Sequence, residues 1–460
     1  MFLRRGALAV AAWILGMGFA PAREAQAEET ILFFERQIQT TTLRPAAQGG
    51  NAVTDSSRAE IMVALGDHRL VVYEPDRVWV YDFTHRRVQS ISPREGTYSD
   101  WSLFGFVAFK EMELENRLAL RRQILSQRGR ARPSVLDLES LFSLPAGSTR
   151  PGANESYADS SRPGHLRVLV NHTIAVDAVL SDTAFAPGRA AAFGRYLAFH
   201  AHLHPDARRA LLRTGKVPRR LFYRYRDFNE ESLVMLRLTR LSSAPETNDP
   251  IATSRRVDIS DPSFRELNAR LAACRQCGER GDWANASRRF EAAALDSGRT
   301  LDAALARVER VLGGCERDSI WPAAIDRRAP GDSAIAACRA ALSWRDSTGA
   351  VAALARLDRV NGARLEKGYV LDYVRGRARF AVGDLETGAY LMMGGLGGNP
   401  CMAGGWLDLA HGYLRGYQPI LAWICFEAAE QTEASACGAR LAERSERERV
   451  LEKRYPELFE

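Results

Sequence analysis

Short runs of alternating apolar and polar residues fill the first half of the chain, which is the pattern of β-strands that are buried on one face. Turn residues such as Gly66-Asp67-His68 separate neighbouring runs. The period becomes helical over residues 101–127, and a helical pair follows at about 188–214. The expected strands are 30–38, 60–65, 69–73, 78–83, 87–92, 173–180, 220–228 and 232–241. We predict an α+β domain over residues 28–245, with an antiparallel sheet covered by helices.

Two stretches lack a clear pattern. Residues 45–58 are predicted to be a polar loop, and residues 129–165 a long connection with one short helix at 136–142. Residues 246–261 have no apolar periodicity and are the expected linker to a second domain. The order of the elements before this linker is similar to that of the open half-barrels of periplasmic lipoprotein carriers. The alternative is an exported α+β module of another kind.

Small residues recur every 34 positions in the second half of the chain. The pairs are Gly376 and Ala410, Gly388 and Ala422, and Gly395 and Ala429. The same positions moved back by three repeats are Cys274, Ala286 and Ala293. Small residues at these places let the two helices of a hairpin approach closely, so the pattern predicts stacked helical hairpins at about 267–299, 369–400 and 403–434. The charged segment 434–454 is expected to cap the stack, within an all-α domain over 262–460.

These repeats resemble the tetratricopeptide repeat family over residues 262–432. Its consensus spacing is matched by Trp406-x-x-Leu409-Ala410-x-x-Tyr413 and by Ala422-x-x-x-Phe426-x-x-Ala429. The resemblance implies a concave groove, lined by the first helix of each hairpin, that binds a peptide or protein partner. The first helices carry Arg379, Trp406, Tyr413 and Arg415, which are therefore the expected groove residues. For Trp406 and Tyr413 a place in the core is the favoured alternative.

The first 27 residues have the features of a secretory signal peptide. Two arginines precede the apolar run 7–20, and Ala25-Gln26-Ala27 is a small-x-small cleavage site. No later stretch is apolar enough to span a membrane. We therefore expect a periplasmic or secreted bacterial protein that has no transmembrane span after signal cleavage.

The charge of the chain is mild. There are 63 Lys and Arg against 56 Asp and Glu, for a net charge of +7. This excess is too small to indicate nucleic-acid binding. The apolar fraction of 46% is typical of a folded chain.

All seven cysteines lie after residue 273, and an exported chain is expected to form disulfides. We expect Cys315 to pair with Cys338 and Cys401 with Cys437, with Cys425 left as the free thiol. Cys274-Arg-Gln-Cys277 has the spacing of a redox or metal half-site, but no second ligand pair follows it. Packing or a disulfide is the favoured interpretation of this pair.

Residues 207–226 carry eight basic residues and no acidic one, with aromatic residues between them. On a strand, Arg220, Arg224 and Arg226 would face one way and Tyr223 and Tyr225 the other. A solvated outer face explains this arrangement. The functional alternative is a face that binds the phosphate groups of an anionic lipid or glycan.

The remaining motifs have structural explanations. His200-x-His202-x-His204 precedes Pro205, which is typical of the start of a helix, so cap and loop histidines are favoured over a metal site. The glycine-rich run 394–405 lacks the Lys-Ser/Thr of a phosphate loop and is expected to be a loop between repeats.

No catalytic arrangement of side chains is recognisable, and no cofactor is expected. The main hypothesis is a non-enzymatic protein that binds an envelope protein through its C-terminal groove. The alternative is a lipid- or glycan-binding protein that uses residues 207–226.

Overall fold

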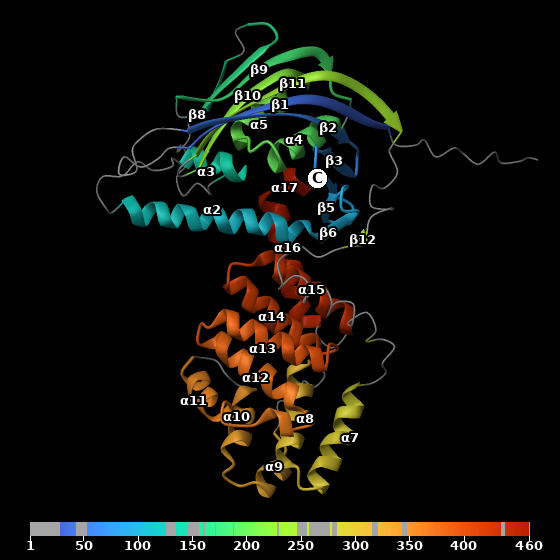
Figure 1. Cartoon of the computed structure of the whole chain (residues 1–460), viewed down its shortest axis with the longest axis vertical. Helices are drawn as coiled ribbons and strands as arrows, with labels where there is room; N and C mark the ends of the chain where they lie inside the picture. The colour runs from blue at the N-terminus through green and yellow to red at the C-terminus, as the bar shows by residue number, and fades with distance from the viewer. Residues whose placement is uncertain are drawn as a thin grey trace, which may run out of the picture.

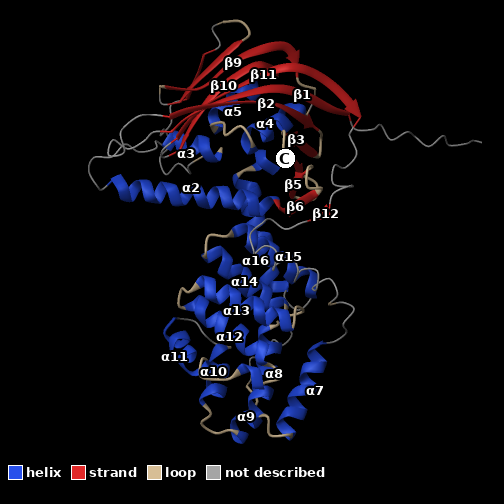
Figure 2. Ribbon diagram, in the orientation of Figure 1, coloured by secondary structure: helices blue, strands red, loops and turns tan. Residues whose placement is uncertain are grey.

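The computed structural model has an α+β lobe followed by an all-α lobe, as the sequence predicts (Figures 1 and 2). We call residues 28–256 the sheet lobe and residues 283–433 the helical lobe. The residues that the structure describes are 28–42, 53–125, 135–145, 156–159, 162–170, 172–186, 188–227, 230–245, 255–256, 277, 283–314, 321–342, 347–433 and 438–459. The expected signal peptide and most of the expected linker lie outside them.

One twelve-stranded sheet forms the sheet lobe, in the order β12-β6-β5-β4-β3-β2-β1-β11-β10-β9-β8-β7. Every neighbouring pair is antiparallel apart from the two-residue pairing of β12 with β6. The strands are β1 (Glu28–Thr42), β2 (Val53–Leu65), β3 (Arg69–Tyr73), β4 (Val78–Asp82), β5 (Arg87–Ser92), β6 (Thr97–Ser102), β7 (Ser156–Asp159), β8 (His165–Val170), β9 (Thr173–Ala184), β10 (Lys216–Asp227), β11 (Glu230–Pro245) and β12 (Arg255–Arg256).

The sheet curves over a layer of helices (Figure 1). These are α2 (Leu103–Leu125), α3 (Val135–Phe142), α4 (Arg189–Phe199) and α5 (Pro205–Arg213). Alternate residues of β1 point into this layer, where Leu32 and Phe34 are almost fully buried. Phe34 stacks on Phe193 and Tyr196 of α4. Apolar alternation therefore determines which face of the sheet the helices cover.

Five strand segments were not predicted. Residues 53–58 were assigned to a polar loop, but they pair with the end of β1, where Val53 lies opposite Thr42. Their side chains are mostly exposed, so no apolar alternation marks them. β7 lies inside the stretch predicted as a connection, and β8 begins at the last residue of that stretch. β6 overlaps the start of the predicted helix 101–127, and β12 lies in the predicted linker.

Pairs of antiparallel helices form the helical lobe. Its elements are α7 (Trp283–Asp296), α8 (Thr300–Leu312), α9 (Ala323–Arg328), α10 (Ser333–Ala341), α11 (Ser347–Leu357), η2 (Gly362–Arg364), α12 (Gly368–Ala381), α13 (Leu385–Gly398), α14 (Ala403–Arg415) and α15 (Pro419–Glu433). The predicted hairpins at 369–400 and 403–434 correspond to α12–α13 and α14–α15. A Cβ atom on Gly376 would lie 2.6 Å from the carbonyl oxygen of Gly388, which confirms that small residues permit close helix approach. Membership of the tetratricopeptide repeat family stays a prediction.

Direct contacts join the two lobes. The backbone of Gly105 in α2 lies against α15, since a Cβ atom there would be 3.3 Å from Ile420 and from Trp423. Arg87 in β5 bonds Glu427 in α15 at 2.5 Å. The lobes therefore share a buried boundary that contains an ion pair.

The last two helices lie at this boundary rather than at a free end of the stack. α16 (Gly438–Arg454) contacts both α15 and α2, and α17 (Pro456–Phe459) packs against α4 beneath the sheet (Figure 1). Phe459 stacks on Phe104 with ring centroids 5.0 Å apart. Glu457 bonds Arg208 of α5 at 2.8 Å. α16, which belongs to the predicted cap 434–454, thus lies on the last helix of the stack, and the residues after it complete the sheet lobe.

In the part of the chain that the structure describes, every helix is too short or too polar to cross a bilayer.

Candidate partner-binding groove

An open groove of about 730 Å³ lies in the helical lobe, against the hairpins α12–α13 and α14–α15. We call it the α13–α14 groove. It is lined by Phe380, Leu385, Glu386, Thr387, Ala389, Tyr390, Met393, Gly412, Tyr413, Gly416 and Gln418. Of these residues, Glu386 alone is charged. The groove therefore offers mainly apolar and aromatic surface.

Gly412 in α14 and Gly416 at the end of this helix shape the floor of the groove. A Cβ atom on Gly412 would overlap the ring of Phe380, so only glycine lets α14 lie this close to the end of α12. A Cβ atom on Gly416 would stand 3.3 Å from Leu385. Asp384 caps α13 by accepting a hydrogen bond from the backbone of Thr387 at 3.3 Å, which fixes where the rim begins.

One exposed tyrosine lines the groove, and a second lies between two lining residues in the sequence. Tyr390 on α13 is 68% exposed, and Tyr417, between the lining residues Gly416 and Gln418, is 58% exposed. Tyr417 has a φ of 58°, a left-handed conformation that ends α14 sharply. Exposed aromatic residues beside an apolar hollow are characteristic of protein-binding surfaces.

The four predicted groove residues lie in four different environments. Trp406 is fully buried and donates from Nε1 to the carbonyl of Pro400 at 2.8 Å, so it is a core residue. Tyr413 lines the groove and is 7% exposed. Arg379 is bonded to Asp358 at 3.0 Å. Arg415 is exposed on the last turn of α14, next to the groove.

Sequence reasoning identified Tyr413 but missed Tyr390 and Met393, which also line the groove. The prediction was confined to first helices, whereas Tyr390 and Met393 belong to α13, the second helix of its hairpin. An aromatic residue on the polar face of a second helix was the signal that could have identified Tyr390.

The predicted basic face has the expected orientation. Tyr223 is buried on the helix-covered side of β10, whereas Arg220 is exposed on the other side. Arg224 is half-buried and bonds Glu231 at 3.1 Å, and Arg226 is half-buried as well. Phe222, which is 37% exposed, shares the outer side with these arginines. The face is therefore basic with one apolar residue in it, and part of its charge is neutralised.

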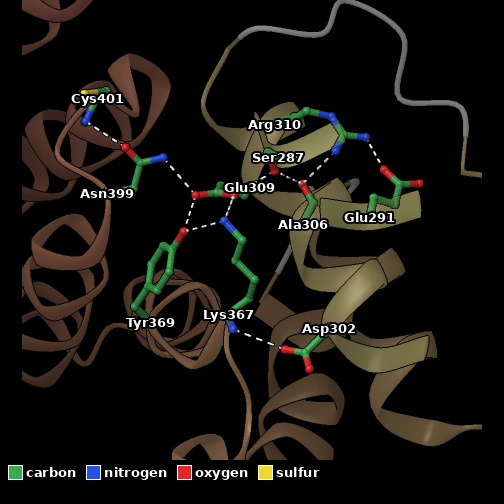
Figure 3. Close-up of polar contacts among 10 residues, drawn as sticks. All are labelled: Ser287, Glu291, Asp302, Ala306, Glu309, Arg310, Lys367, Tyr369, Asn399 and Cys401. Atoms are coloured by element: carbon green, nitrogen blue, oxygen red, sulfur yellow. Dashed lines mark hydrogen bonds and ion pairs between the residues drawn. The ribbon is translucent and has the colours of Figure 1, made fainter. Parts of the chain in front are cut away.

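A buried polar cluster lies away from the groove, where α8 meets α7, α12 and the α13–α14 loop (Figure 3). At its centre Glu309, which is 1% exposed, accepts hydrogen bonds from Ser287 at 2.8 Å, Lys367 at 2.7 Å, Asn399 at 2.8 Å and Tyr369. Burial and the charge of Glu309 raise the pKa of Tyr369, which stays a donor. Every oxygen of this carboxylate is satisfied, so the cluster is structural rather than reactive.

The disulfide differs from both predicted pairings. Cys401 bonds Cys277, and its backbone N–H donates to Asn399 at 3.1 Å, which ties the disulfide to the Glu309 cluster. Cys338 is a buried free thiol, and burial raises its pKa to about 12. The predicted pairs Cys401–Cys437 and Cys315–Cys338 are therefore wrong, because helix spacing in the repeat did not determine which loops meet. Cys315 and Cys437 themselves lie outside the described residues, as does Cys274.

Cys425, the expected free thiol, lies fully buried in α15.

The histidines have the predicted cap and loop roles. His204 is the N-cap of α5, accepting from the backbone of Asp206 at 3.2 Å, and its other nitrogen bonds Glu139 at 3.0 Å. His202 bonds the carbonyl of Leu141 at 2.7 Å.

The glycine-rich run differs from the prediction, because Gly394–Gly398 belong to α13 rather than to a loop. A Cβ atom on Gly395 would lie 2.8 Å from the carbonyl of Tyr369, so this part of the run serves close helix packing.

No protein-family model matches the chain, and no curated protein matches it.

Proposed function

We propose that this protein is a non-enzymatic binding protein of the bacterial envelope that holds a segment of a partner protein in the α13–α14 groove. The observation that carries the proposal is the pair of exposed tyrosines, Tyr390 and Tyr417, beside a mainly apolar groove. Large aromatic side chains contribute most to protein interfaces when a partner buries them, since they cover much area with few rotatable bonds.

The shape of the groove favours a segment over a flat surface. About 730 Å³ accommodates a few side chains of an extended or helical segment, and Tyr390 and Tyr417 would close over its sides. Glu386 at the rim favours a segment with a basic residue near its apolar anchors. An apolar segment with one flanking Lys or Arg is therefore the expected occupant.

Export is the second part of the proposal, and the disulfide supports it. Cys277 and Cys401 are 124 residues apart in the sequence and are bonded. Such bonds persist in oxidising compartments and are rare in the reducing cytosol. We propose a periplasmic or secreted location for the chain.

The test is site-specific photo-crosslinking from the full-length protein in envelope extract. A photoreactive phenylalanine analogue at position 390 is expected to capture a discrete partner. The matched control places the same analogue at position 351, since Val351 is 57% exposed on α11 of the same lobe. Capture at 390 is expected to disappear when Tyr417→Ala is added. Equal capture at both positions, or none at 390, would contradict the groove proposal.

The outer face of β10 supports the second candidate function, the binding of an anionic lipid or glycan. Arg220 is exposed there, and the exposed Phe222 beside it could enter a lipid surface. Co-sedimentation with vesicles rich in anionic phospholipid tests this candidate. Arg220→Glu combined with Arg226→Glu is expected to abolish sedimentation, whereas Arg415→Glu on the helical lobe is the matched control. Sedimentation that the double variant does not change would exclude the basic face.

A further inference from the structure

The sheet lobe contains a separate cavity of about 290 Å³, on the side of the sheet that the helices cover. Its walls come from β1, β4, β10, α2 and the end of α4, and we call it the inner-sheet cavity. The volume is at the small end of the range for ligand pockets. It suits one small ring better than a long acyl chain.

Polar groups stand at its more exposed end. Arg36 bonds Glu74 at 2.6 Å, and their side chains are 25% and 19% exposed. Both residues line the cavity, so this ion pair offers donors and acceptors side by side to whatever enters. Arginine and carboxylate groups placed together can bond neighbouring hydroxyls of one ligand at the same time.

Aromatic side chains form the deeper walls. Tyr81 is 1% exposed and stacks on Phe199 with centroids 4.7 Å apart, and Tyr223 is 4% exposed. Burial raises the pKa of both tyrosines, so their hydroxyls stay protonated. Among the residues that the structure describes, no hydrogen-bond partner is found for either hydroxyl. The walls therefore combine flat apolar faces with available hydroxyl groups.

The cavity carries little net charge. The charge of Arg36 is offset by Glu74. Burial first, and then the charge of Lys110, lowers the pKa of His200 to about 3 and that of His202 to about 4, so both lining histidines are neutral at neutral pH. A charged ligand would lose hydration here without gaining an unpaired counter-charge.

A further contact disfavours a cation when Lys110 is protonated. The amine of Lys110 already lies 5.5 Å from the ring centroid of Phe199 and 5.6 Å from that of Phe106. Both rings line the cavity, and a second cation against them would be repelled. What remains is a small neutral ligand with polar edges and an apolar face.

We propose that the inner-sheet cavity binds one neutral sugar ring. The C–H face of such a ring packs on aromatic walls, while its hydroxyls bond groups such as the Arg36–Glu74 pair. The proposal is independent of the α13–α14 groove. A free monosaccharide and the terminal unit of a longer glycan share this chemistry.

Saturation-transfer NMR on the full-length protein tests it, with glucose, galactose and N-acetylglucosamine as monosaccharide probes and maltose and chitobiose as disaccharide probes. At least one probe is expected to receive saturation from the protein. An excess of the same sugar should compete for the site and reduce the transfer. A monosaccharide that binds as well as its disaccharide indicates a free sugar. A tighter disaccharide indicates the end of a glycan.

Two near-isosteric variants locate the site. Glu74→Gln is expected to weaken sugar binding about tenfold, because it removes a charged hydrogen-bond acceptor. Tyr225→Phe, also in the lining, removes one hydroxyl and is expected to weaken binding less. Glu231→Gln is the matched control, since it removes the partner of Arg224 on the opposite side of the sheet.

Circular dichroism of each variant first establishes that it is folded. Absence of transfer to all five probes would overturn the proposal. So would transfer that Glu74→Gln and Glu231→Gln affect equally. Displacement of the sugar signal by dodecanoate but not by excess sugar would overturn it too, and would make the cavity an acyl site.

Discussion

A buried charged group of the helical lobe, Glu309, and one of the sheet lobe, Arg195, are held in opposite ways. In the helical lobe, Glu309 is almost inaccessible and accepts from four donors. In the sheet lobe, Arg195 is 2% exposed, and its Nε and Nη1 atoms have no partner among the described residues. Its guanidinium instead lies 4.1 Å from the ring centroid of Phe83.

This difference in hydrogen bonding indicates which part of the molecule is rigid and which part responds to pH or to a ligand. A buried charge with all its hydrogen bonds made fixes one arrangement of the elements around it. A buried cation with few bonds retains a desolvation cost that pH or a ligand can change. Lys110 is a second example, since it is buried, donates to the carbonyl of Ala198, and has a pKa lowered to about 7 by burial.

The largest expected effect comes from breaking the hydrogen-bonded cluster around Glu309. Glu309→Ala leaves Lys367 without its carboxylate in a mostly buried position and should destabilise the protein by about 3–5 kcal/mol. Urea unfolding of the full chain measures this loss. The matched control is Asp296→Ala, which removes the exposed ion pair with Arg328 and should cost less than about 1 kcal/mol. Similar losses for the two variants would contradict the role given to the cluster.

As the pH falls, the sheet lobe should lose stability before the helical lobe does. The pKa values of His200 and His202 are about 3 and about 4 in the folded chain, below the ordinary value of 6.5. The unfolded chain therefore binds more protons, so the stabilisation is complete above about pH 6.5 and is lost as the pH falls toward 4. Each histidine contributes up to about 1.4 kcal/mol per pH unit in this window.

Hydrogen exchange resolved by peptide measures this acid effect. Amides of β1 and β11 are expected to lose protection before those of α12 and α13 as the pH falls. The His200→Asn variant should weaken the pH dependence, whereas His85→Asn, at an exposed position, should not. Loss of protection in both lobes at the same pH would show that they respond as one unit.

Removal of the disulfide should have a smaller but clear effect on the helical lobe. Cys277→Ala with Cys401→Ala opens a bond that spans 124 residues, and the expected loss is about 2–4 kcal/mol. Reductant should lower the unfolding midpoint of the natural chain and leave that of the double variant unchanged. A midpoint that is insensitive to reductant in both proteins would contradict this prediction.

The smallest expected effect concerns the contact of α17 with the sheet lobe. Glu457→Gln removes the carboxylate partner of Arg208, which is 2% exposed. The expected cost is about 1 kcal/mol, at the low end for a charged hydrogen bond, because Glu457 is itself 45% exposed. Thermal unfolding measures it, with Glu446→Gln in the exposed part of α16 as the control. An equal, negligible shift in both variants would show that Arg208 does not need this partner.

Apolar periodicity was enough to predict both fold classes and most elements. It failed where a strand is held by backbone pairing alone, as in residues 53–58 of β2. The small residues Gly376 and Gly388 correctly indicated a tight hairpin, because the absence of a side chain is a local property. Sequence reasoning thus succeeds where the cause lies within one element.

The candidate sites were harder to predict, because they depend on contacts between distant segments. Cys277 and Cys401 are 124 residues apart in the sequence, so no spacing rule within one repeat could have given the pair. The inner-sheet cavity is lined by both Arg36 on β1 and Tyr225 on β10, two strands that are brought near each other only by the order of strands in the sheet, with β11 between them. Trp406 looked like a groove residue, but the depth of burial of a first-helix tryptophan depends on the neighbouring hairpins.

The position of α17 beneath the sheet has a consequence for the order of folding. The sheet lobe comprises most of the first half of the chain, yet Arg208 and Phe104 receive their partners from residues 457 and 459. A chain whose amino terminus emerges first, whether from the ribosome or through a secretion channel, can assemble the strands early. Its concave side then stays open until more than two hundred further residues have followed, so the part made first is the part finished last.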